Sequence, residues 1–219
     1  MKHALRWALV VALLAGALVV ALWPRANPVS APSSITQAVA AAPSIEQLRS
    51  RAALQPCPSA HRAAGPSGNS IASSAGGPLS GLVLPCLGQP GTVDLAAALA
   101  GQPALLNLWG PRCQPCAQEL PALAAYAAEP RAVAVLGVEV QQLPSAALEE
   151  LAALNVRYPS VSDPEGKLRA ALHAPAVIPL TYLVSADGKV AQVNPPEVMR
   201  SPEQVRAVVA RYLGLGATE

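Results

Sequence analysis

Four cysteines carry the reactive groups of this 219-residue chain, and two of them lie three positions apart. Cys113 and Cys116 frame the sequence Cys-Gln-Pro-Cys, directly after the apolar run 104–109 and at the start of a helical pattern. Backbone N–H groups and the helix dipole stabilise a thiolate at such a position, so the spacing indicates an attacking thiol at Cys113. Cys116, one turn further, is close enough to form a small ring with Cys113 and resolve a mixed disulfide.

Other uses of this pair are less well supported. A c-type haem site needs His after the second Cys, where the chain has Ala117. A zinc site needs a second close pair, whereas Cys57 and Cys86 are 29 positions apart and the three His are scattered. A purely structural Cys113–Cys116 bridge stays open, although tight rings at helix starts are strained and reducible.

The other two cysteines, Cys57 and Cys86, predict a structural disulfide between the segment before the domain and its first strand region. In the chain-entropy model, closing a loop of about 30 residues contributes about 3–4 kcal/mol. A second redox pair that passes electrons to Cys113 and Cys116 is the competing interpretation, and nothing in the spacing supports it.

Short apolar runs alternate with helical patterns after residue 78, which predicts an α/β domain. We expect strands at 82–84, 104–109, 133–140 and 181–184, and helices at 113–128, 145–154, 167–173 and 202–213. Ser145 has the position of a helix cap. Asp187-Gly188 predicts a hairpin turn, so parallel units come first and an antiparallel hairpin and a terminal helix follow.

The chain before this domain divides into two parts. Lys2 and Arg6 precede an uncharged apolar run that ends at Trp23, so residues 1–23 predict an uncleaved signal-anchor, or a cleaved signal peptide that releases a secreted protein. Residues 24–77 predict a flexible linker, because 34 of these 54 residues are Ala, Ser, Pro or Gly. Within it, Ser44 and Gln47 have capping-box spacing, so 44–54 is a candidate helix.

Charge argues against a nucleic-acid partner. Residues 1–77 hold six Lys and Arg against one acid, whereas residues 78–219 hold nine against twelve, so the folded domain is not basic. The basic N-terminal part instead suits a membrane-facing segment.

Residues 107–121, which read NLWGPRCQPCAQELP, and residues 178–188, which read IPLTYLVSADG, together resemble the two signatures of TlpA/ResA-type thioredoxin-like proteins. The resemblance covers about residues 80–215 and is most like actinobacterial members. It implies a thioredoxin-like fold, a central mixed sheet flanked by helices, on the outer side of the cell membrane. It also implies thiol–disulfide exchange with proteins of the cell envelope, including a role in cytochrome c maturation, without a cofactor or metal.

The resemblance also assigns site residues. Cys113 and Cys116 match the catalytic pair, and Pro179 would follow a cis bond and face the disulfide, leaving the backbone of Ile178 to pair with a bound chain. An edge-strand proline is the alternative for Pro179. Glu119 matches an acid beside the pair that could accept a proton from Cys116; a glutamate that only complements the helix dipole is the alternative.

One position departs from the family pattern. Arg112 stands where the family usually has Trp before the first Cys, so a flat apolar contact becomes a cation that should lower the pKa of Cys113 and favour acidic or polar partners. A solvated surface Arg with little effect is the alternative. Trp109 lies close enough in sequence to be a substrate contact.

The leading hypothesis is therefore a membrane-tethered, extracytoplasmic thiol–disulfide oxidoreductase, with reductase preferred because the proline within Cys-Gln-Pro-Cys resembles reducing members. A membrane electron donor of the CcdA/DsbD type would recharge it. A non-catalytic module that holds copper or a partner protein is the alternative, and nothing in the local motif suggests a peroxidase.

Overall fold

The computed structural model describes residues 42–59 and 77–214. Its strands are β1 Val83–Pro85, β2 Thr92–Asp94, β3 Ala104–Trp109, β4 Ala134–Glu139, β5 Ser160–Ser162, β6 Leu180–Val184 and β7 Val190–Gln192. Its helices are α2 Ile45–Ala52, α3 Leu95–Ala98, α4 Gln114–Ala127, α5 Pro144–Ala153, α6 Lys167–Ala171 and α7 Pro202–Leu213. The expected anchor over residues 1–23 lies outside the described ranges.

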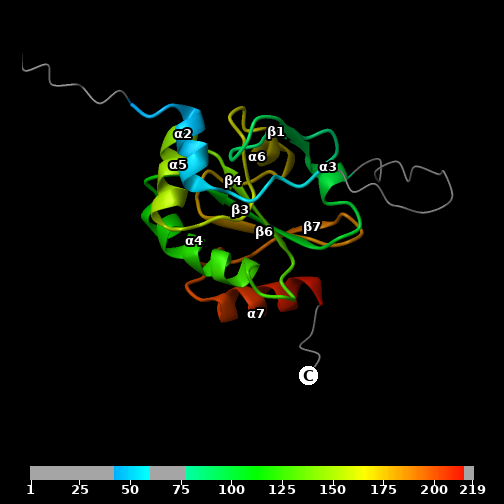
Figure 1. The fold of residues 1–219 in the computed structure, drawn as a ribbon. Coiled ribbons are helices and arrows are strands. Elements are labelled where there is room, and N and C mark those ends of the chain that lie inside the picture. The colour runs from blue at the N-terminus through cyan, green and yellow to red at the C-terminus, as the bar shows by residue number, and fades with distance from the viewer. Residues whose placement is uncertain (1–41, 60–76, 215–219) are drawn as a thin grey trace, which may run out of the picture. The chain divides into compact units, whose positions relative to one another are not determined.

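Five strands form a central mixed sheet in the order β5-β4-β3-β6-β7, and β1 and β2 form a separate antiparallel pair (Figure 1). Strands β3, β4 and β5 are parallel, whereas β6 is antiparallel to β3 and β7 is antiparallel to β6. The mixed pattern expected from the sequence is confirmed. The reversal at β6 brings its first residue, Leu180, opposite Leu108 near the end of β3.

Strand β3 is the centre of the fold because both of its faces are covered. All six of its residues are buried, and Asn107 is the only polar one. Leu105 and Trp109 belong to one core cluster, whereas Leu106 and Leu108 belong to the other. A continuous apolar run of this kind is typical of a strand buried on both sides.

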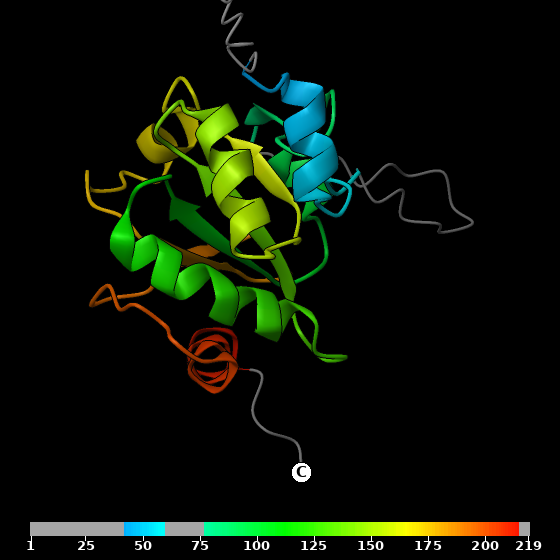
Figure 2. The same cartoon turned by 60° about the vertical axis from the view of Figure 1, so that its left-hand side comes forward.

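Helices cover one face of the sheet, and a thinner layer covers the other. Buried side chains of α2, α4, α5 and α7 form a core with the first face, and β1, β2, α3 and α6 supply the second core. Figure 2 shows α4 lengthwise and α7 nearly end-on, so these two packed helices cross. Helix α4, which begins within the cysteine motif, therefore packs against both the sheet and α7.

Helix α2 extends the folded unit into the segment expected to be linker. The capping box between Ser44 and Gln47 is formed as the spacing predicts, and Leu48 and Ala52 are buried where α2 packs on α5. The compact unit consequently starts at Pro43. The difference from the expected boundary at 78 arises because Leu48 and Ala52 of α2 bury apolar surface in the core that they share with α5.

The start of helix α5 differs from the expectation. Helix α5 begins at Pro144, and Leu143 occupies the cap position without a side-chain bond, so the predicted Ser145 cap is wrong. Proline suits the first helical position because its fixed φ is helical and its missing N–H would have no partner there.

Among the described residues, no helix combines the length and the apolar character needed to cross a bilayer.

Candidate active site

The two cysteines of the motif lie where β3 gives way to α4. Cys113 is the cap residue of α4, and its sulfur accepts a hydrogen bond from the backbone N–H of Cys116 at 3.2 Å. The two residues form a disulfide with a Cα–Cα distance of 5.2 Å. Cys113 is half-buried and Cys116 fully buried, so only the first sulfur is placed for attack by or on another molecule.

The second motif lies directly against this disulfide. The Ile178–Pro179 bond is cis, and the carbonyl oxygen of Ile178 is 3.9 Å from Cys113 Sγ. Because the bonded sulfur carries no proton, this is a contact rather than a hydrogen bond. Val177, the residue before it, is 55% exposed. Two segments more than 60 positions apart thus form one surface, with a free backbone carbonyl beside the reactive sulfur.

Glu119 is buried on α4, three residues after Cys116 and therefore on the same side of the helix. Its Oε2 accepts a hydrogen bond from Asn107 Nδ2 at 2.8 Å, and its Oε1 accepts one from the backbone N–H of Met199 at 3.1 Å. Burial outweighs both bonds, with a smaller contribution from the charge of Glu197, and raises the pKa of Glu119 from 4.5 to about 7. The carboxyl group can therefore exchange a proton near neutral pH.

The interior around Glu119 contains further polar groups. The side-chain atoms Asn107 Oδ1, Trp109 Nε1, Tyr158 OH and Thr181 Oγ1 are buried without a hydrogen-bond partner among the described residues. Burial and the nearby charge of Glu119 raise the pKa of Tyr158. The phenol of Tyr158 thus stays neutral. Glu119 has no basic side chain as a hydrogen-bond partner among the described residues.

Trp109 does not lie where a substrate contact is expected. Its side chain is fully buried in the core shared with Cys116. The physical reason is the central position of β3, whose last residue remains covered on both faces. Its expected direct contact with a bound chain has no exposed surface to support it.

Arg112 is exposed next to Cys113 and has a φ of 65°. Its guanidinium forms no salt bridge within the described residues. Its backbone N–H donates to Glu150 Oε2 at 2.9 Å. The sequence did not predict Glu150, because its contact depends on how α5 packs. It did not predict Asn107 either, although a polar residue within an apolar strand indicates a buried polar partner, here Glu119.

The second disulfide joins Cys57 to Cys86 with a Cα–Cα distance of 6.2 Å. Cys86 is 4% exposed, and its backbone forms an isolated antiparallel β-bridge with Val161 of β5. Cys57 Sγ lies 3.4 Å from the carbonyl oxygen of Ser160. This bond ties the segment after α2 to the strand layers. All four cysteines are paired, and no free thiol remains.

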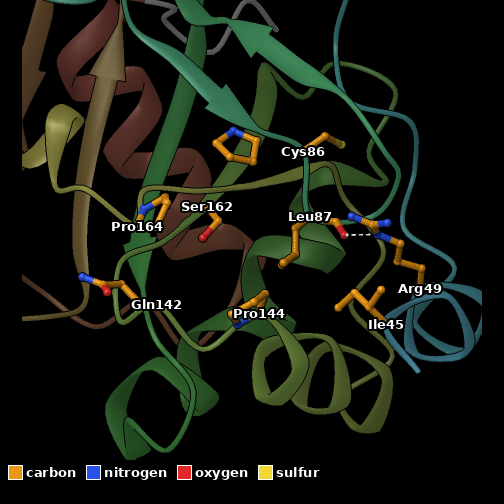
Figure 3. A pocket seen from close by; sticks show the side chains of 9 residues that line it. Ile45, Arg49, Cys86, Leu87, Gln142, Pro144, Ser162 and Pro164 are labelled. Atoms are coloured by element: carbon orange, nitrogen blue, oxygen red, sulfur yellow. Dashed lines mark hydrogen bonds between the residues drawn. The ribbon is translucent and has the colours of Figure 1, made fainter. Parts of the chain in front are cut away.

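A pocket of about 460 Å³ adjoins this second disulfide rather than the first (Figure 3). On its wall the Arg49 side chain donates to the carbonyl oxygen of Leu87 at 3.1 Å and forms a salt bridge with Glu46 at 2.6 Å, so its charge is already engaged. The lining residues are Ile45, Arg49, Pro85, Cys86, Leu87, Gln142, Pro144, Ser162 and Pro164. None of them belongs to the cysteine motif, so the pocket does not mark the redox chemistry.

Metal binding has no preformed site in the described part of the chain, where no group of three or more His, Cys, Asp or Glu is placed to hold an ion. For the copper alternative the sequence offers His173 together with Cys113 and Cys116, and these two cysteines are bonded to each other.

A mixed sheet with a Cys-X-X-Cys disulfide at a helix start, facing a cis proline, defines a thioredoxin-like fold. A model described as the AhpC/TSA family matches residues 81–193, more than half of the chain, and the chain belongs to this family. The comparison agrees with the TlpA/ResA-type resemblance of the two motifs.

Named relatives support the same assignment. The chain is 37% identical over 114 residues to the thiol:disulfide interchange protein DsbE of Xylella fastidiosa, and the match covers 52% of this chain and 57% of that protein. It is 30% identical over 114 residues to the soluble secreted antigen MPT53 of Mycobacterium tuberculosis, covering 52% of this chain and 65% of the antigen. The chain therefore spans less than two thirds of the length of these relatives.

A solved structure resembles the fold over nearly its whole length. It is a secreted Mycobacterium tuberculosis disulfide oxidoreductase homologous to Escherichia coli DsbE, with a TM-score of 0.54 and 28% identity. The match covers 61% of this chain and 97% of that structure. The thioredoxin-like fold expected from the sequence is confirmed.

Proposed function

We propose that this chain is a protein thiol–disulfide oxidoreductase of the cell envelope. The observation that carries the proposal is the Cys113–Cys116 disulfide at the start of α4, beside the cis Ile178–Pro179 segment. This arrangement offers one accessible sulfur, one buried sulfur and a backbone surface for a bound chain. The names of the relatives point to the same chemistry.

The first step uses the reduced form. The Cys113 thiolate attacks one sulfur of a client disulfide; a bond forms between these two sulfurs, the client disulfide breaks, and the leaving client thiolate takes up a proton. The N–H of Cys116 and the amino end of α4 stabilise the thiolate before the attack.

The second step releases the client. Glu119 accepts the proton of the Cys116 thiol, and Cys116 Sγ then attacks Cys113 Sγ, so that the mixed disulfide breaks. The second client sulfur leaves as a thiolate and takes up the proton that Glu119 accepted, so the client leaves as a dithiol. Two electrons pass to the client, and the Cys113–Cys116 disulfide is restored. An acid with a pKa of about 7 suits this transfer because it is partly ionised at neutral pH.

Client binding involves the surface around Cys113. An extended client chain pairs with the backbone of Ile178 next to Pro179, as in strand addition. The guanidinium of Arg112, which forms no salt bridge within residues 42–59 and 77–214, favours a client with acidic or polar side chains beside its disulfide. The electrons reside in the dithiol itself, so the reaction needs no bound cofactor.

The location and the direction of transfer form part of the proposal. Residues 1–23 anchor the domain on the outer side of the membrane, or direct its secretion if they are cleaved. The domain acts as a reductase, and a membrane protein of the CcdA/DsbD type returns two electrons and the matching protons to Cys113 and Cys116. The secreted relatives support the extracytoplasmic location.

Trapping tests the proposal. Reduced Cys116→Ser protein, mixed with a disulfide-bonded test protein, is expected to accumulate a covalent adduct through Cys113, visible on a non-reducing gel and removed by dithiothreitol. The matched Cys113→Ser protein should give none. Equal adduct from both variants, or none from either, would contradict the assigned roles.

A further inference from the structure

Glu150 is the acidic side chain that contacts the residue before the attacking cysteine. Its Oε2 accepts the backbone N–H of Arg112 at 2.9 Å across a sequence separation of 38. Its second oxygen, Oε1, is buried and has no hydrogen-bond partner among the described residues. The carboxylate is thus committed to the cysteine loop rather than to a neighbour on its own helix.

The bond holds an unusual backbone. Arg112 has a φ of 65°, in the left-handed region that residues with a side chain rarely adopt unless their surroundings hold them there. Arg112 is followed by Cys113, whose sulfur caps α4. A shift of the Arg112 peptide would therefore move the attacking sulfur relative to the helix start.

Helix α5 is a firm base for this contact. Leu148 and Leu151, on either side of Glu150 in the sequence, are fully buried. Before the helix, buried Glu139 accepts the N–H groups of Gln141 at 2.6 Å and of Leu143 at 3.2 Å, which fixes the turn that enters α5. The position of Glu150 is consequently fixed by the packing of Leu148 and Leu151 in the core.

The charges near Cys113 are few. Arg112 adjoins it in sequence, Glu150 reaches its loop from α5, and Glu119 is buried on α4 six positions after Cys113. Buried Glu139 ends β4 opposite Trp109, the last residue of β3. Residues 174–179 carry no charge. Beside α4, the segment before α7 brings Glu197, paired with Arg211, and Arg200, which donates to Gln118.

We propose that Glu150 is a positioning residue for thiol exchange: it fixes the Arg112 peptide, and its negative charge offsets the guanidinium of Arg112 and so limits how far the Cys113 thiolate is stabilised. This inference rests on the proposed function. Removal of the charge alone would favour the thiolate and thereby the reduced form of the pair.

The test separates charge from geometry. Glu150→Gln keeps an acceptor oxygen and removes the charge, Glu150→Ala removes both, and Glu149→Gln is the matched control because Glu149 is exposed on the same helix. The reduced proteins are alkylated with iodoacetamide across a pH range, which gives the pKa of Cys113, and amide hydrogen exchange is followed at Arg112.

The pKa of Cys113 should fall by about 0.5 in Glu150→Gln, which makes alkylation about threefold faster at a pH below that pKa, and should stay unchanged in Glu149→Gln. The Arg112 amide should stay protected in Glu150→Gln and lose protection in Glu150→Ala. An unchanged pKa in Glu150→Gln, or a wild-type Arg112 amide that exchanges as fast as in Glu150→Ala, overturns the proposal. Neither readout requires turnover, so a wild-type protein that fails to exchange with clients would remove the proposed function by a separate result.

Discussion

The two disulfides of this protein are the same bond in two different settings. Cys113 and Cys116 are three positions apart, and the first sulfur is half-exposed at a helix start. Cys57 and Cys86 are 29 positions apart, and Cys86 is covered by the strand layers. The first disulfide closes a ring with a sequence separation of only 3, whereas the second closes a loop with a separation of 29 and attaches the segment after α2 to the domain.

Their neighbours differ as well. Near the first bond stand Arg112, Glu150 and Glu119, whose pKa is raised to about 7, so protons and charge can follow the sulfur chemistry. Around the second bond the partners are backbone groups such as the carbonyl of Ser160 and apolar side chains. On the proposed function, the ionisable neighbours of Cys113 and Cys116, and not the disulfide itself, set this pair apart from Cys57 and Cys86.

Removal of the second bond should have the largest effect on stability. Cys57→Ser with Cys86→Ser opens a loop with a sequence separation of 29, which should lower the free energy of unfolding by about 3–4 kcal/mol. Exchange by the remaining folded protein should be retained. Urea unfolding and the adduct assay measure the two quantities.

The matched control is Cys113→Ser with Cys116→Ser. Its ring spans a separation of only 3, so the expected loss is about 1–2 kcal/mol, and exchange should disappear. If the two double variants lost equal stability, or if exchange also failed in folded protein without Cys57 and Cys86, the division into structural and reactive bonds would be wrong.

The second prediction concerns the pH dependence that Glu119 gives to stability. Its pKa is 4.5 in the unfolded chain and about 7 in the folded one, so between these values the folded state binds more protons and loses stability as pH rises. The wild type should lose about 3 kcal/mol over this window through this group. Glu119→Gln should lack the loss, and urea unfolding at pH 5 and pH 8 measures the difference.

Glutamine fits this site because its Oε1 can accept the N–H of Met199. Its amide can donate to Asn107 Oδ1, which has no partner in the described structure, once the Asn107 amide group turns over. Glu149→Gln, an exposed change, is the control and should keep the wild-type slope. Parallel pH profiles for the wild type and Glu119→Gln would show that Glu119 does not titrate in this window.

The third and smallest expected effect compares two glycines, one beside each bond. A Cβ at Gly88 would lie 2.8 Å from the Cβ of Leu54, which cannot swing away, whereas a Cβ at Gly110 would meet the end of the exposed Gln141 side chain at 2.5 Å. Gly88→Ala should cost about 1–2 kcal/mol, and Gly110→Ala less than about 0.5 kcal/mol. If Gly110→Ala lowered the unfolding temperature more than Gly88→Ala, the more tightly packed glycine would be the one beside Cys113 and Cys116 instead.

Strong local patterns let the sequence predict much of this fold. The central strand β3 matches the apolar run 104–109 over its full length, and α7 matches the pattern 202–213. Short elements were missed: β5 has three residues between Pro159 and Asp163, two of them serines, and its pairing with β4 supplies what its own sequence lacks.

The candidate site was predictable to the extent that it lies in one stretch of chain. Cys113 and Cys116 follow from their spacing at a helix start, and the resemblance added Glu119 and Pro179. Met199 and Glu150 were not accessible, because their contacts depend on segments that fold back from far along the chain. The burial of Trp109 likewise depends on layers that no local pattern describes.

The antiparallel direction of β6 has a practical consequence. Ile178, just before β6, contacts Cys113. The last residue of the strand, Val184, lies opposite Ala104 and leads into the turn at Asp187 and Gly188, at the other end of the strands. That turn is exposed and distant from the reactive sulfur. A fluorophore, an affinity handle or a pair of new chain ends placed there would leave the client-facing edge unobstructed.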